Sequence, residues 1–178
     1  NFSNIRLEVL ENNSSGKIIL NEAEVNSTNS NIGFAGYILL NASNSIEISN
    51  SQLLADGNQG RIGMGKSEEL GETFSPQNVT ITDSSSLSTT NSFVTDENLQ
   101  DEPINAGDIT IDANENILLS NDSRIRASTR RLGDAGNVSL NAGNNITLQN
   151  ENIIEGNRNF IESSTSSQGD AGNVTLTA

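Results

Sequence analysis

Acidic residues in two stretches of the chain are the candidates for acid–base chemistry. Glycoside hydrolysis requires two carboxyl groups that face one groove, about 5–10 Å apart. A lyase also requires a basic residue beside them, and Lys66 is the one basic residue in either stretch. The interpretation we favour is instead a pair of solvated surface loops. The candidate carboxylates are Glu68, Glu69 and Glu72 in residues 64–76, and Asp96, Glu97, Asp101 and Glu102 in residues 93–103.

Asp134 and Asp170 form a second candidate site, for calcium. Each is the second residue of the phrase Gly-Asp-Ala-Gly-Asn. If the two phrases form equivalent corners of a repeating structure, the carboxylates lie close together, and a bound cation would relieve their repulsion. The glycine-rich nonapeptide of calcium-binding β-rolls is missing, however, and an Asp at a corner also caps the backbone by accepting an N–H. Both interpretations stay open, and no other cofactor is predicted.

Four arginines in the segment Ser-Arg-Ile-Arg-Ala-Ser-Thr-Arg-Arg make the one basic patch of the chain. Such a patch suits acidic glycans or the acidic loops of a neighbouring chain. The alternative is a solvent-facing strand whose arginines balance nearby carboxylates. The residues are Arg124, Arg126, Arg130 and Arg131.

The overall composition excludes several classes of function. A net charge of −14 repels nucleic acid. The absence of His and Cys excludes Ser-His-Asp and Cys-His catalysis as well as disulfides. Apolar runs are far shorter than the roughly 20 residues of a transmembrane helix. Hydrophobic residues are 33% and aromatic residues 3%, which is low for one round core.

A recurring strand pattern organises the chain. A Gly or Gln is followed by alternating aliphatic residues, as in "GYILL" from Gly36 and "GNVSL" from Gly136. A second alternating segment follows about eight residues later, and then a shorter third one. The first core aliphatics are Ile18, Ile38, Ile62, Val79, Ile109, Val138 and Val174. The second strands carry Ile46 and Ile48, Ile117 and Leu119, and Ile146 and Leu148, and the third carry Leu53 and Ala55, Ile125 and Ala127, and Ile153.

Short strands with one apolar face bury that face only when copies stack. Three strands in each coil of about 20–30 residues, with Gly and Asn at the corners, predict an all-β parallel β-helix. We expect about seven coils in a single segment over residues 1–178, with 64–76 and 93–103 as projecting acidic loops that end at Pro76 and Pro103. Phe160 and Ile161 are expected in core or coil-cap packing. A β-sandwich and a propeller fit less well, because the strands are short and the phrase is fixed.

The repeats resemble those of filamentous-haemagglutinin-like exoproteins, cyanobacterial ones in particular. The likeness rests on "GFAGYILLNASNSIEISNSQLLA", "NAGDITIDANENILLSNDSRIRAST" and "GDAGNVSLNAGNNITLQN", and it covers residues 14–62 and 78–178. It implies a right-handed parallel β-helix, export by two-partner secretion, an extracellular or cell-surface location, and a role as adhesin, filament or toxin stalk. The Asn-Pro-Asn motif of the secretion domain does not occur, and no catalytic residue is implied.

We therefore expect a structural or adhesive segment and not an enzyme. Both ends look cut, so the chain is expected either to continue or to assemble end to end into a filament. The alternative is a polysaccharide-binding or polysaccharide-cleaving module on the same scaffold. An autotransporter passenger segment would look the same in sequence.

Overall fold

Strands make up all of the regular secondary structure that the computed structural model describes. The described residues are 4–9, 15–29, 33–66, 74–91, 103–130, 132–150 and 158–178. They contain no helix of the length and apolarity that a membrane span needs. Three parallel sheets hold the strands, so the all-β parallel β-helix is confirmed.

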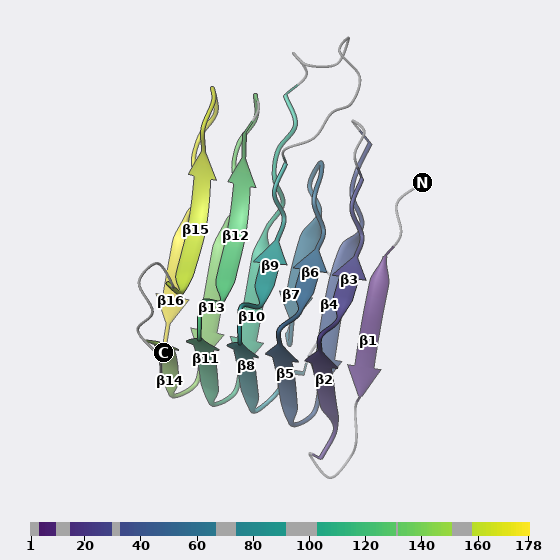
Figure 1. The fold of residues 1–178 in the computed structure, drawn as a ribbon, viewed down its shortest axis with the longest axis vertical. Helices are drawn as coiled ribbons and strands as arrows, with labels where there is room; N and C mark the ends of the chain where they lie inside the picture. Colours follow the sequence, from purple (N-terminus) through teal and green to yellow (C-terminus); the bar gives the residue numbers. More distant parts are fainter. Residues whose placement is uncertain are drawn as a thin grey trace.

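Each coil contributes one strand to each sheet (Figure 1). Sheet A is β1 (Ile5–Val9), β4 (Tyr37–Ala42), β7 (Arg61–Met64), β10 (Ile109–Ala113), β13 (Val138–Ala142) and β16 (Val174–Thr177). Sheet B is β2 (Lys17–Asn21), β5 (Ser45–Ser49), β8 (Asn78–Thr82), β11 (Asn116–Ser120) and β14 (Asn145–Gln149). Sheet C is β3 (Glu24–Asn26), β6 (Gln52–Leu54), β9 (Ser86–Ser88), β12 (Arg124–Thr129) and β15 (Phe160–Thr165).

The core is a set of stacked aliphatic columns. In sheet A, Ile38 pairs with Ile62, and Ile109 pairs with both Ile62 and Val138. The side chains of these residues are at most 1% exposed. The period-two alternation of a strand sends the residues between them to the outside, as in Thr110. One β-branched side chain over another fills the interior without a void, which is why each coil repeats the pattern of the coil before it.

The number of coils differs from the expected seven. The pairing gives five complete coils and the first strand of a sixth. Ile18 and Val79 were counted as coil starts, but both lie in sheet B, where Ile46 pairs with each of them. A Gly or Gln before an aliphatic alternation occurs at two corners of the coil, so the pattern alone does not separate first strands from second strands.

Two boundaries are also corrected. Met64 was expected to begin a loop, but it ends β7 and is 1% exposed in the core. The third strand of the fifth coil was expected at Ile153, which lies outside the described residues, whereas β15 begins at Phe160. The rest of the two predicted acidic loops lies largely outside the described residues. In the flanking positions that are described, Pro76 is buried and Pro103 is exposed.

Glycine at the corner before sheet A is required by the close approach of successive coils. A Cβ on Gly136 would lie 2.0 Å from the carbonyl oxygen of Gly107, and one on Gly107 would lie 1.8 Å from that of Gly60. These contacts are with backbone atoms, which cannot move aside as a side chain can. The glycine of the recurring phrase is therefore a consequence of stacking.

Candidate functional site

The outer face of sheet C carries the predicted arginine patch. Strand alternation points Ile125 and Ala127 of β12 into the core and turns Arg124 and Arg126 outward. Ser128 lies on the same face as the arginines but is buried. Arg130 follows the end of β12 and is exposed. Arg131 lies outside the described residues. The structure thus places three of the four predicted arginines along one strand line.

Phe160 lies beside these arginines. It pairs in register with Arg124, so its ring is on the outer face of the sheet, and the expectation of core packing is wrong for this residue. Ile161 points inward and packs against the core, as expected. The guanidinium carbons of Arg124 and Arg126 lie 5.4 and 5.2 Å from the ring centroid. Cation–π attraction at this range holds both guanidiniums over the ring.

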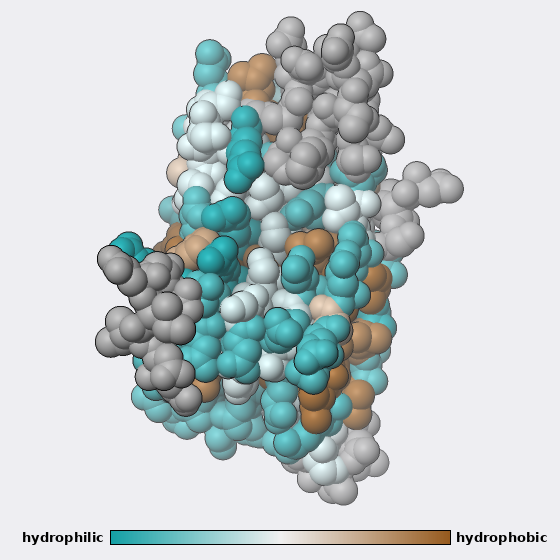
Figure 2. Space-filling model, in the orientation of Figure 1, coloured by the Kyte–Doolittle hydropathy of each residue, from teal (hydrophilic) through white to brown (hydrophobic). Residues whose placement is uncertain are grey.

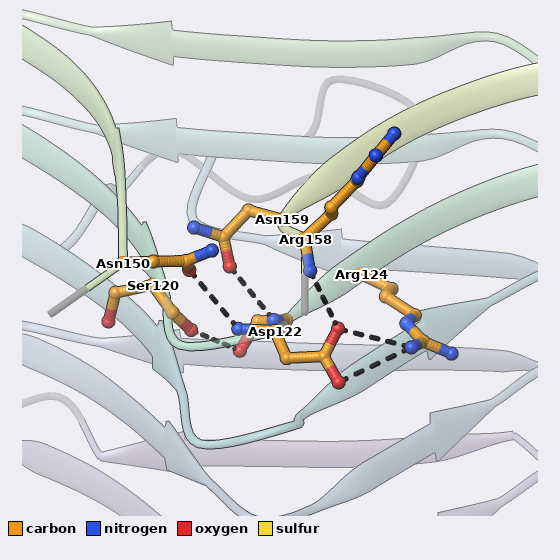
Figure 3. Close-up of polar contacts among 7 residues, drawn as sticks. Ser120, Asp122, Arg124, Asn150, Arg158 and Asn159 are labelled. Carbon is orange, nitrogen blue, oxygen red and sulfur yellow. Dashed lines mark hydrogen bonds and ion pairs between the residues drawn. The ribbon is translucent and has the colours of Figure 1, made fainter. Parts of the chain in front are cut away.

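Carboxylates anchor two of the arginines. Arg126 Nε lies 3.1 Å from Glu162 Oε2, and the hydroxyl of Ser164 also donates to Glu162. Arg124 reaches Asp122 at 3.1 Å, and the backbone N–H of Arg158 donates to the same carboxylate at 3.2 Å (Figure 3). The guanidinium of Arg158 points away from Asp122 in this view. The ion pairs therefore hold Arg124 and Arg126 in place and leave Arg158 directed elsewhere.

Asp122 occupies a left-handed corner that brings it under the patch. Its φ is 64°, and that of Asn121 before it is 53°. Asn and Asp tolerate this region better than other non-glycine residues. The next coil satisfies the backbone there, because Asn150 Oδ1 accepts the N–H of Asp122 at 3.3 Å and Asn159 Oδ1 accepts that of Ser123 at 2.9 Å.

A polar hollow opens beside Arg126. Its volume is about 140 Å³. Hydroxyls, guanidiniums and one carboxylate surround this hollow. The guanidinium of Arg130 makes no hydrogen bond or ion pair within the part of the chain that the structure describes. The lining residues are Thr90, Arg126, Ser128, Thr129, Arg130, Glu162, Ser164 and Ser166.

Asp56 lies one coil before Thr90, beside this region. Its carboxylate accepts the hydroxyl of Ser88 at 2.6 Å and the backbone N–H of Thr90 at 2.7 Å. Burial raises the pKa of the Asp56 carboxyl above its ordinary value, although these hydrogen bonds and the charge of Arg126 act in the opposite direction. The carboxyl serves as a fixed acceptor that orders the chain after β9.

The two predicted calcium ligands occupy equivalent corners, as their shared phrase suggests. Asp170 donates its backbone N–H to Asp134 Oδ1 at 2.9 Å, and Asp134 donates its own to Asn105 Oδ1 at 2.8 Å. One carboxylate oxygen of Asp134 thus caps the next coil. Within the described ranges, no group of three or more Asp and Glu side chains could hold a metal ion. Calcium binding by this pair stays a prediction.

The remaining predicted site residues do not enter this site. The carboxylates proposed for polysaccharide cleavage, Glu68 to Glu72 and Asp96 to Glu102, lie outside the described residues. Lys66 is described, and its backbone N–H donates to Ser75 Oγ at 3.2 Å. Cleavage by these groups stays a prediction.

Sequence reasoning missed Asp56, Asp122, Arg158, Phe160 and Glu162 as members of the site. The available signal was the alternation of Phe160, Glu162 and Ser164, which matches the outward positions of Arg124, Arg126 and Ser128. The longer connection between β14 and β15 hid it, because a fixed spacing places the third strand too early.

Comparison with protein-family models, curated proteins and solved structures gave no match.

Proposed function

We propose that this chain is a structural and adhesive segment of a secreted β-helical exoprotein of the filamentous-haemagglutinin type, displayed at the cell surface. The stack of coils serves as a stiff spacer, and its outer faces and ends make the contacts. Backbone hydrogen bonds that run between coils in all three sheets support the spacer role.

The observation that carries the proposal is the surface formed by β14, β15 and β16 at one end of the stack (Figure 1). Leu148, Val174 and Leu176 are in register with core residues, yet they are 45%, 45% and 49% exposed. Each of these three strands also pairs on one side alone. Apolar residues in core register beside unpaired strand edges favour the addition of a further coil.

The strand count determines how a second copy would join this end. Sheet A has six strands, whereas sheets B and C have five each. A copy whose β2 and β3 pair with β14 and β15 brings its own β1 to the place that β16 occupies. End-to-end joining of copies therefore requires β1 or β16 to give way, whereas a coil that begins in sheet B adds without conflict.

Electron microscopy and sedimentation velocity test the proposal with matched variants. With β1 or β16 displaced from sheet A, the chain should associate end to end in a concentration-dependent manner, giving rods longer than the roughly 24 Å that five coil steps span. Leu148→Glu with Leu176→Glu should abolish this association, because charges would replace the apolar end surface. Thr147→Glu with Thr175→Glu places the same charges on the outer face of the same strands and should leave it intact.

The same series contains the outcomes that would refute the proposal. If the unmodified chain remains a single short particle at all concentrations, end-to-end association is excluded. If the Thr variants disrupt association as strongly as the Leu variants, the contact is lateral and the end surface is not responsible.

A further inference from the structure

We infer that the outer face of sheet C binds an acidic polysaccharide through its arginines, which rests on the adhesive part of the proposed function. We call this surface the sheet C patch. It consists of Thr90, Asp122, Arg124, Arg126, Ser128, Arg130, Arg158, Phe160, Glu162 and Ser164.

The patch is rich in positive charge, whereas the chain as a whole is negatively charged. Four arginines face the three carboxylates of Asp56, Asp122 and Glu162 here, while the whole chain carries −14. Arg124 and Arg126 are held by Asp122 and Glu162 and by the ring between them. Arg130 and Arg158, within the described part of the chain, have guanidiniums that no carboxylate neutralises. Two arginines are therefore available for an anionic ligand at a surface that is already ordered.

The chemistry of the patch favours carboxylates on a hydroxyl-rich ligand. A guanidinium fork matches a carboxylate with two parallel hydrogen bonds. The hollow between Arg126 and Arg130 is lined with the hydroxyls of Thr90, Ser128 and Ser164, which suit the hydroxyls of a sugar. Hydrophilic and neutral residues cover most of the face that sheets B and C present, and apolar residues appear there as separate patches (Figure 2).

Other classes of partner fit less well. Double-stranded DNA carries one negative charge about every 1.7 Å along its axis. A chain with a net charge of −14 repels such a dense polyanion. Protein interfaces depend on buried apolar or aromatic anchors. Phe160 is the one aromatic residue of the patch, and two guanidiniums lie over its ring. A polysaccharide with well-separated carboxylates avoids both difficulties.

The spacing of the arginines sets the length of the ligand. Arg158 donates its backbone N–H to Asp122 at the corner before β12, whereas Arg130 follows the end of β12. The six residues of β12 that lie between these two positions span about 20 Å. A ligand that engages Arg158 and Arg130 together must therefore be an oligomer, and a single uronic acid reaches one arginine alone.

Calorimetry with galacturonate and its oligomers tests the inference. Affinity should rise with oligomer length until the oligomer spans about 20 Å, and fully methyl-esterified oligomers should not bind. Arg130→Gln and Arg158→Gln should each weaken the long oligomer about tenfold, since each removes one charge-assisted contact. Lys17→Gln on sheet B removes the same charge from a different face and should have no effect.

The results separate the two proposals. Equal binding of esterified and free oligomers, or an equal effect of Lys17→Gln, would overturn carboxylate recognition by the sheet C patch. No binding of any oligomer would also overturn it, and would leave end-to-end association standing. Binding without end-to-end association would instead refute the proposed end-to-end contact and leave the patch intact.

Discussion

Replacement of Gly136 by Ala tests whether close stacking of the corners is what requires glycine. The added Cβ would lie 2.0 Å from the carbonyl oxygen and 2.4 Å from the carbonyl carbon of Gly107. Both atoms belong to a backbone that is itself stacked on Gly60, so relief requires the two coils to separate locally. Overpacking of this kind costs about 3 kcal/mol at the upper end of its usual range.

A smaller effect acts in the opposite direction. Gly→Ala restricts the unfolded chain and contributes about 0.4–1 kcal/mol of stability where the folded backbone tolerates it. The expected net loss for Gly136→Ala is therefore about 2 kcal/mol. For a chain of this size, that lowers Tm by about 4–8 °C.

Gly63→Ala is the matched control. Its Cβ would meet the side-chain atom Leu39 Cδ1 at 3.2 Å and no backbone atom, so this variant should lose less stability than Gly136→Ala. Urea unfolding followed by circular dichroism measures both. The reasoning is refuted if Gly136→Ala unfolds at the same urea concentration as the unmodified chain, or if Gly63→Ala loses as much stability.

Three further predictions concern the core and the carboxylates. Ile109→Ala removes a fully buried member of a core column and should cost about 2–5 kcal/mol in thermal unfolding, whereas Thr110→Ala on the outer face should change stability by less than about 0.5 kcal/mol. Burial raises the pKa of Asp56, so the folded state holds the proton of this carboxyl more tightly than the unfolded state does. The contribution of Asp56 to stability therefore falls as pH rises from the ordinary pKa of 3.8 through the raised pKa. As pH rises from 3 to 7, the stability of Asp56→Asn relative to the unmodified chain should therefore increase. That of Asp83→Asn should decrease over the same range, because hydrogen bonds from Asn121 and Ser49 lower the pKa of Asp83. Urea unfolding at both pH values measures the two changes, and changes of the same sign in the two variants would contradict the prediction. In Lys17→Gln, the pKa of Glu47 followed by NMR should move up toward its ordinary value of 4.5, because the hydrogen bond from Lys17 is the largest cause that lowers it.

The sequence was sufficient for the fold class and for the orientation of most strand residues. Alternation in β10 and β12 predicts which side chains face inward, and the structure buries Ile109, Ile111 and Ile125 completely. The shared phrase of the sequence also predicted equivalent corners for Asp134 and Asp170, and in the structure the backbone N–H of Asp170 donates to Asp134. These features depend on residues within a few positions of one another, so a local pattern carries them.

The register between coils and the composition of the sheet C patch depended on the tertiary structure. Ile18 pairs with Ile46 rather than Ile38, and Phe160 pairs with Arg124. Both pairings depend on the lengths of corners and insertions, which no aliphatic pattern encodes. Strand alternation is a property of the local chain, whereas stacking neighbours come from different coils. The sequence therefore determined what faces inward, and the fold decided which residues meet across the surface.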